Sequence, residues 1–224
     1  MTTSDESASP RRRQRRYEGP LTTEIIVDAA MAIVREQGLE ALTMRRLAAD
    51  LRVAPMSVYR HIDDRQTLLL AMLDVVADGV SPPPVSADPR AEITAVMTAI
   101  HDVLQDDPWA IGLLVSDKLA SPKILPAVNR IYTALTNSGL APRDVSVAYM
   151  LIWHYTVGEL LDRHHTPADA FSRTMVRSAD PSEYPGLMSV VAGLPEGPPS
   201  DHYAENLQRI LDGLTGRLPP AARA

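Results

Sequence analysis

The sequence predicts an all-α protein with an N-terminal helix-turn-helix domain of three helices and a larger helical C-terminal domain. Apolar residues recur at helical spacing through most of the chain, and no stretch alternates as a strand would. Several helix starts carry one signal, a capping residue followed by proline, at Asp88-Pro89, Asp107-Pro108, Ser121-Pro122 and Thr166-Pro167. A break at residues 81–84 separates domains expected at 20–80 and 85–224.

Composition excludes several classes of function. The 224 residues are 45% hydrophobic and 22% charged, and none is cysteine, which rules out disulfides and thiolate chemistry and fits a reducing compartment. The longest charge-free apolar run, residues 145–158, is too short to cross a bilayer, and we expect neither a signal peptide nor contact with a membrane. We therefore expect a cytoplasmic protein.

Charge is divided unevenly along the chain, whose net charge is −6. The acidic excess lies beyond residue 65, so the N-terminal part can still bind an anionic partner. Residues 1–19 are polar and rich in arginine, and we expect a disordered arm that either aids solubility or contacts phosphates.

The N-terminal helices follow from spacing and caps. Apolar residues from Ile26 to Val34 form one helix face, with Thr22 or Thr23 as the cap and Gly38 at the end. A second helix starts after Thr43, and Arg52 and Val53 turn the chain into a short third helix that runs from Pro55 to about Ile62. Asp63 and Gln66 have the spacing of a capping box for a fourth helix that ends near Gly79.

The second and third helices have the proportions of a helix-turn-helix, in which a slim helix enters the major groove of DNA. Val58 and Ile62 are spaced to hold the short helix to a core, while Ser57, Tyr59 and Arg60 present donors for phosphates and base edges. Arg45 and Arg46 lie near the positive end of the preceding helix, which favours an anion.

Residues 22–73 resemble the DNA-binding domain of the TetR family of bacterial transcriptional regulators. The likeness rests on these residues: Gly38, Leu42-Thr43, Leu47-Ala48, Leu51, Val53, Val58-Tyr59-Arg60-His61 and Leu68-Leu69. It implies a homodimer that binds double-stranded DNA and is released by a small-molecule ligand. The residues that it implies at the DNA are Thr43, Arg45, Pro55, Met56, Ser57, Tyr59, Arg60, His61 and Arg65.

The resemblance also implies separate roles. Thr43 caps its helix and bonds a phosphate, and Arg45 reaches a base edge. Pro55 and Met56 make apolar contacts in the groove. Tyr59 packs on the sugar-phosphate backbone, which is also contacted by residues Ser57, His61 and Arg65.

The C-terminal part is similar to the tetracycline repressor subgroup at residues 156–162 and 203–214. It departs from the subgroup at Gly112, which stands where an ungapped alignment puts the subgroup's magnesium-binding histidine. We therefore expect neither a bound metal nor a metal-chelated tetracycline, and no cofactor.

The remaining helices are expected to pack around an interior and against a second subunit. Stripes span residues 93–104 and 124–135, one long helix runs from Pro142 to about His165, and a last one covers 205–214. Residues that could line a ligand cavity, or simply pack the core, are Met97, Ile100, His101, Trp109, Leu113, Met150, Trp153, His154 and Val157. The long helix and the last helix carry apolar residues on more than one face, which favours a four-helix dimer interface.

These features predict a ligand-responsive transcriptional regulator, a repressor, that binds a palindromic operator as a homodimer. We find no motif of an enzyme: a Gly-x-Ser-x-Gly turn, a phosphate-binding glycine loop and paired histidines on one helix face are all missing. An alternative is a helical small-molecule-binding or enzymatic module whose N-terminal helices merely pack. A helical adaptor for protein partners is a third possibility.

Overall fold

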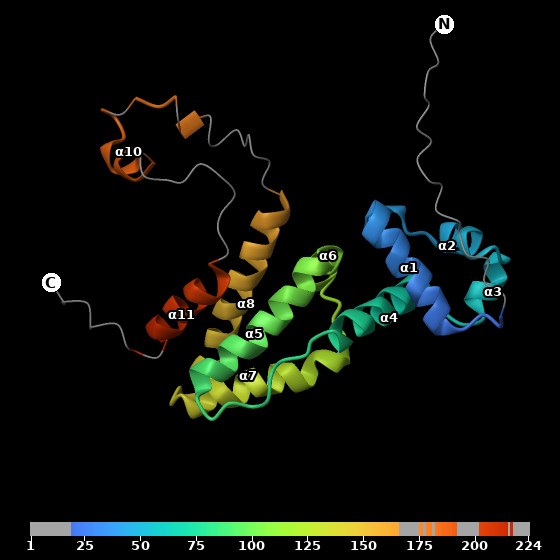
Figure 1. The fold of residues 1–224 in the computed structure, drawn as a ribbon, viewed down its shortest axis with the longest axis horizontal. Helices are drawn as coiled ribbons and strands as arrows, with labels where there is room; N and C mark the ends of the chain where they lie inside the picture. Colours follow the sequence, from blue (N-terminus) through green and yellow to red (C-terminus); the bar gives the residue numbers. More distant parts are fainter. Residues whose placement is uncertain are drawn as a thin grey trace, which may run out of the picture. The chain divides into compact units, whose positions relative to one another are not determined.

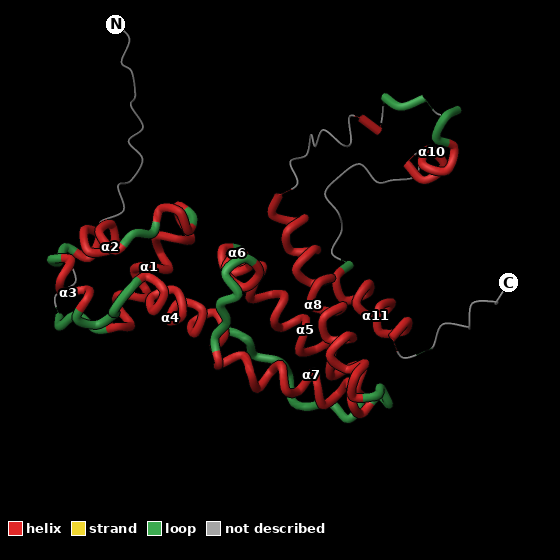
Figure 2. Tube along the Cα trace, turned by 180° about the vertical axis from the view of Figure 1, so that it is seen from behind, coloured by secondary structure: helices red, strands yellow, loops and turns green. Residues whose placement is uncertain are grey.

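Over the part of the chain that the structure describes, helices joined by loops and turns are the only regular secondary structure, as expected (Figure 2). The structure is a computed structural model, and it describes residues 19–165, 175–176, 178–180, 182–191, 202–214 and 216. These residues divide into two compact units, Met1–Met72 and Leu73–Ala224. The predicted arm lies outside the described residues, apart from Gly19, as does the Thr166-Pro167 signal.

The N-terminal unit begins with α1 (Thr23–Gln37) and the short 3-10 turn η1 (Leu39–Ala41) (Figure 1). Thr22 caps α1 by accepting a hydrogen bond from the Ile25 amide. Gly38 ends the helix at a φ of +82°, where a residue with a Cβ would be strained. The buried residues of α1 include the stripe that spacing predicted, namely Ile26, Ala30, Ile33 and Val34.

Helices α2 (Met44–Leu51) and α3 (Pro55–Tyr59) form the helix-turn-helix. The turn between them depends on Arg52, which adopts the left-handed conformation, and on the Val53 amide, which donates to the Ala48 carbonyl at 3.0 Å. Helix α3 ends at Tyr59, earlier than predicted, but Ile62 is still buried as expected.

Helix α4 (Arg65–Asp78) passes from the first unit into the second between Met72 and Leu73. The predicted cap was wrong by one residue, because the Thr67 amide donates to Asp64 Oδ1 at 2.7 Å. That bond lowers the pKa of Asp64. The units divide inside α4, upstream of the proline-rich segment, and the expected domain limits of 20–80 and 85–224 stay a prediction.

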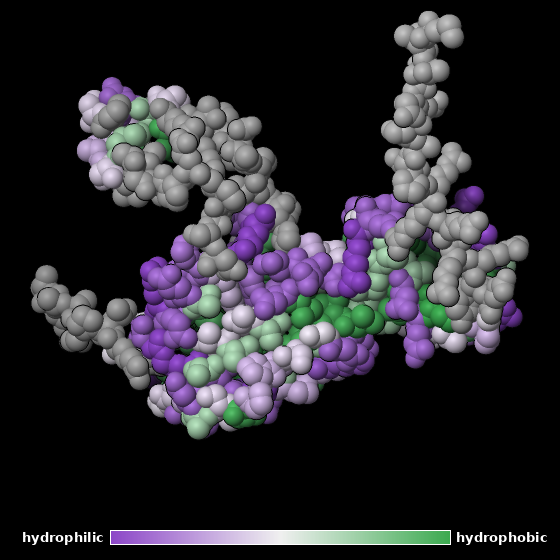
Figure 3. Space-filling view, in the orientation of Figure 1, coloured by the Kyte–Doolittle hydropathy of each residue, from purple (hydrophilic) through white to green (hydrophobic). Residues whose placement is uncertain are grey.

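The second unit is built on α5 (Pro89–Asp106), which packs against α7 (Leu125–Asn137), α8 (Pro142–His165) and α11 (Tyr203–Leu214). Shorter helices are α6 (Trp109–Val115), the 3-10 turn η2 (Pro122–Ile124) and α10 (Pro185–Val191). Helix α11 starts two residues before its predicted start. Its buried residues are Tyr203, Leu207 and Leu211, and hydrophilic residues cover it on the visible face (Figure 3).

Two of the predicted cap-proline signals act as expected. Asp88 accepts a hydrogen bond from the Arg90 amide, and Ser121 accepts one from the Lys123 amide. Asp107 does not cap α6. Its buried carboxylate instead accepts a hydrogen bond from the indole N–H of Trp109 at 2.9 Å, and Pro108 stands directly before the helix.

A buried ion pair fastens the connection between α4 and α5. Glu92 Oε1 lies 2.5 Å from Arg130 Nε, and Glu92 Oε2 accepts the Ser86 amide at 2.8 Å. Arg130 Nη2 donates to the Pro83 carbonyl at 2.9 Å. The hydrogen bond with Arg130 lowers the pKa of Glu92 and raises that of Arg130. In the described part of the chain, no helix is long and apolar enough to cross a membrane.

Candidate nucleic-acid interface and interior ligand site

Helix α3 exposes two large side chains, one of them fully apolar. Met56 is 70% exposed and Tyr59 is 41% exposed, whereas Val58 and Ile62 are fully buried. The helix is therefore held to the unit by one face and presents the other to a partner. Proline at its first position costs no hydrogen bond, because that amide has no partner inside the helix.

The remaining predicted contact residues lie on the surface of the same unit. Ser57 is half-buried, and the exposed residues are Thr43, Arg45, Pro55, Arg60, His61 and Arg65. Arg60 Nη2 donates to Ser57 Oγ at 3.0 Å, which limits the positions that the guanidinium can take. The structure thus brings all nine residues to the surface of one unit, on α2, α3 and the start of α4.

Thr43 shows how one side chain can serve the fold and a ligand. Its Oγ1 accepts the Arg46 amide at 3.1 Å, which satisfies an amide at the start of α2. A threonine hydroxyl carries one hydrogen as well as its lone pairs. The hydrogen can therefore be donated to a phosphate oxygen while the cap remains.

The sequence reasoning missed the pairing of Arg46. Its Nε lies 3.0 Å from Asp50 Oδ1, one turn along α2, and the i, i+4 spacing of opposite charges could have indicated this. The pair reduces the charge that Arg46 offers to an anion. Among the described residues Arg45 has no such ion pair, so we assign the free positive charge at the start of α2 to Arg45.

In the second unit, most residues of the predicted cavity are interior. The buried ones are Met97, Ile100, His101, Leu113 and Val157, and Trp109 and Trp153 are half-buried. They come from α5, α6 and α8.

His101 is the polar centre of this interior. Its Nε2 lies 2.8 Å from Glu159 Oε2 on α8, and its Nδ1 lies 3.2 Å from Asp102 Oδ1. Arg163 also pairs with Glu159. The imidazole stacks on the ring of Tyr203 from α11, with the ring centroids 4.0 Å apart. One histidine therefore joins three helices.

Tyr203 extends the cluster. Its hydroxyl lies 2.8 Å from Thr156 Oγ1, and its ring is nearly parallel to that of Tyr155, with the centroids 5.6 Å apart. Burial raises the pKa of Tyr203, so the phenol stays neutral and can donate a hydrogen bond. Sequence reasoning did not identify Tyr203, Thr156 or Glu159 as site residues. The i, i+4, i+8 spacing of Tyr203 with Leu207 and Leu211 is the signal that could have shown its side chain to be interior.

Met150 and His154 are not brought together with this interior. Both are exposed on a face of α8 that also carries Val147, Leu151 and Leu161. Ile152, Thr156 and Leu160 on the opposite face are fully buried. The long helix is thus apolar both where it packs and where it is open.

The described residues contain no group of three histidine, aspartate or glutamate side chains that could hold a metal ion. Gly112 lies in α6, and a Cβ at this position would meet no atom within 4 Å. Space is therefore not the reason for a glycine here.

Two family models match the chain. One, described as bacterial regulatory proteins of the tetR family, matches residues 26–72, and one described as the tetracyclin repressor-like C-terminal domain matches residues 82–218. The HTH-type transcriptional repressor DrrR1 of Streptomyces coeruleorubidus is 32% identical over 218 residues, which are 91% of this chain and 81% of the relative. The tetracycline repressor protein class C of Escherichia coli is 26% identical, and the match covers 87% of this chain and 90% of the relative.

Solved structures have the same fold. The Streptomyces coelicolor TetR family protein ActR in complex with actinorhodin aligns with a TM-score of 0.73 and 24% identity, over 92% of this chain and all of its own. BioQ with its double-stranded DNA operator aligns with a TM-score of 0.62 and 24% identity, over 87% of this chain and 98% of its own.

Proposed function

Because this chain belongs to the tetR family of bacterial regulatory proteins, we propose that it is a repressor that binds a palindromic operator as a homodimer and leaves it when a small molecule binds. The observation that carries the proposal is the pair of exposed apolar residues, Met56 and Tyr59, on a helix whose other face is buried. The major groove of DNA offers such side chains apolar contacts, for example with thymine methyl groups.

At the operator, α3 lies in the major groove. Met56 and Pro55 contact apolar groups such as a thymine methyl, and Tyr59 packs on the sugar-phosphate backbone. Arg45 reaches a base edge from the start of α2. Thr43 donates its hydroxyl hydrogen to a phosphate, and backbone contacts come from residues Ser57, Arg60, His61 and Arg65. BioQ was solved with its operator, which supports this reading by likeness of fold.

The second subunit covers the open apolar face of α8. Val147, Leu151 and Leu161 would otherwise remain in water, at a cost of about 25 cal/mol for each Å² of apolar surface. A symmetric pairing of this face with its copy buries it without a further partner. Met150 and His154 then lie at the interface, and we place them there rather than in the interior.

The effector binds among the interior residues of α5, α6 and α8. Met97, Ile100, Trp109, Leu113, Trp153 and Val157 would supply its apolar contacts, and His101 a polar one. ActR bound to actinorhodin offers a parallel in a protein of the same fold. A ligand changes operator affinity only if it prefers one arrangement of the helices, and α4, which joins the two units, would carry that preference to the recognition helices.

Neither an enzymatic activity nor a cofactor belongs to this proposal. The working location is the bacterial cytoplasm, where the operator is.

The proposal is tested by fluorescence anisotropy with a labelled duplex that the protein itself selects from a random pool. The variants R45A and Y59A should each bind this duplex at least about fivefold more weakly, since base and backbone contacts cost roughly 1–3 kcal/mol each and about 1.4 kcal/mol is tenfold. Wild-type affinity should also fall steeply with salt.

R35A is the matched control, because it removes one arginine from α1 in the same unit. It should retain nearly all of the affinity, and circular dichroism should show all three variants to be folded. Equal affinity of R45A, Y59A and wild type would contradict the interface. Failure of the wild type to select any duplex would favour the alternative of a small-molecule-binding module without DNA binding.

A further inference from the structure

We propose that Ser121 and Lys123 form a two-point anchor that fixes the C-terminal half of α4 and so sets the half-site separation that the dimer accepts. The inference rests on the proposed function and names positioning residues for it. Neither residue belongs to the predicted sites, and both lie on or beside η2, between α6 and α7.

The first point of the anchor is a buried hydroxyl. Ser121 is only 5% exposed, and its Oγ donates to Asp74 Oδ1 on α4 at 2.5 Å while accepting the Lys123 amide at 3.0 Å. A hydroxyl has a single hydrogen to donate, and here α4 receives it. The cap of η2 and the bond to α4 therefore depend on one side chain.

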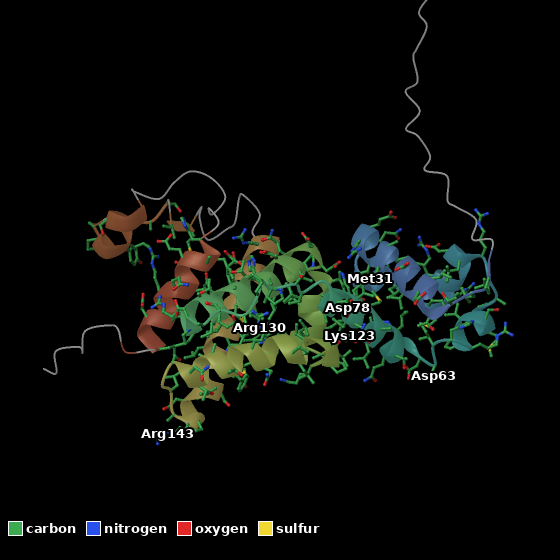
Figure 4. All side chains as sticks on the ribbon, turned by 60° about the horizontal axis from the view of Figure 1, so that its bottom comes forward. Met31, Asp63, Asp78, Lys123, Arg130 and Arg143 are labelled. Carbon is green, nitrogen blue, oxygen red and sulfur yellow. The ribbon has the colours of Figure 1, made fainter. Side chains whose placement is uncertain are left out.

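The second point is an ion pair one helical turn further on. Lys123 Nζ lies 2.5 Å from Asp78 Oδ2, and the two residues are neighbours in Figure 4. The bond to Asp78 raises the pKa of Lys123, so the ammonium stays charged. The pair is open to solvent and adds little stability. Its contribution is to hold α4 in one position.

Together the two points restrain α4 against both rotation and sliding. Asp74 and Asp78 are four residues apart, so they lie on one face of the helix. At the end of that turn, a Cβ on Gly79 would meet a Val103 methyl at 3.5 Å, an ordinary van der Waals distance, so the end of α4 also lies against α5. The end of α4 is therefore held from two directions.

The anchor also lies next to the proposed effector site. Helix α6 carries Trp109 and Leu113, and the Leu119 amide donates to the Leu113 carbonyl at 3.1 Å. Only residues 116–120 separate α6 from Ser121. A ligand that moves α6 would therefore act on the two bonds that hold α4.

The test needs no effector. The wild type selects its operator from a random duplex pool, and affinity is then measured for duplexes whose half-sites are one base pair closer or farther apart, a change of about 3.4 Å with a rotation of about 35°. We expect the wild type to lose about tenfold in affinity at the altered spacings, a difference of about 1.4 kcal/mol. The S121A/K123A double variant should lose no more than about threefold, because its α4 can adjust.

Three controls separate positioning from stability. S121T keeps the hydroxyl, and the exchange D78K/K123D keeps an ion pair with the two charges swapped. Unlike S121A/K123A, both variants should therefore keep the wild-type preference for half-site spacing. K118N removes the protein's other lysine, and asparagine tolerates the positive φ of residue 118. It should leave the preference unchanged. Hydrogen exchange should be faster at residues 73–80 in the double variant.

The outcomes are distinct. If the wild type and the folded double variant discriminate spacing equally, or if the wild type does not discriminate at all, the anchor is overturned while the repressor stands. If the double variant does not fold, the D78K/K123D exchange and its two single variants decide the question. A wild type that selects no duplex overturns the proposed function itself.

Discussion

The charge of Glu92 stabilises the connection between α4 and α5. Its carboxylate is buried, pairs with Arg130 and accepts the Ser86 amide. E92Q keeps the volume but removes the charge, so we expect a loss of about 1–3 kcal/mol in the free energy of unfolding at pH 7, measured in urea. E205Q is the control. It breaks an exposed pair with Arg209 on α11 and should change stability little.

The same pair predicts a dependence on pH. The hydrogen bond with Arg130 lowers the pKa of Glu92 in the folded protein. The stabilisation is then complete above the unfolded pKa and is lost as the pH falls through the folded one. The stability difference between wild type and E92Q should therefore narrow as the pH falls below the ordinary glutamate pKa of 4.5. A difference that stays constant over this range would show that the charge of Glu92 is not what stabilises the connection.

His101 separates what a sequence can predict about a residue from what it cannot. Spacing placed His101 on an apolar face, and its burial agrees. Its partners could not be predicted, because Glu159 and Tyr203 come from helices far along the chain and any of several carboxylates could have served. The DNA-contacting set was easier to propose, since α2, the turn and α3 are adjacent in sequence.

At the scale of elements, the turn of the helix-turn-helix carries a measurable strain. Arg52 ends α2 at a φ of 57°, a conformation that costs a residue with a Cβ about 1 kcal/mol relative to glycine. R52G should therefore raise the stability of the protein by up to about 1 kcal/mol, measured by thermal unfolding. G38A is the reciprocal control at φ +82° and should destabilise. A lower melting temperature for R52G would mean that the arginine side chain supports the turn.

Elements were predicted well where a local signal decides them. The caps Thr22, Thr43, Asp88 and Ser121 act in the structure as their spacing implied. Two adjacent aspartates before α4 left the cap ambiguous, and the geometry of the turn selects Asp64. Helix α10 was not predicted, because its seven residues are too few to show a period.

At the scale of the whole molecule, the sequence indicated one feature that a single chain leaves unexplained. Helix α8 was expected to be apolar on more than one face, and the structure shows a buried face opposite an open one. The bond of Ser121 to Asp74 could not be predicted, because the two residues are 47 positions apart in the sequence and no local signal pairs them.

The open face gives the last prediction. Leu151 lies in the middle of this face and is 49% exposed. In a symmetric interface each copy would bury one carboxylate introduced at this position, so two carboxylates would be buried without a partner. L151D should therefore be a folded monomer by light scattering at concentrations where the wild type is a dimer. Its operator affinity should fall about a hundredfold or more, since the two half-sites no longer bind as one unit.

V85D is the matched control for that experiment. Val85 is 73% exposed in the connection before α5, so this variant makes a comparable apolar-to-acidic change away from α8. It should remain a dimer with unchanged affinity. If both variants stay dimeric, the chains associate through another surface. L151D could also be monomeric and still bind the full operator as tightly as the wild type. Avidity would then contribute nothing to binding, and one recognition helix on one half-site would be sufficient.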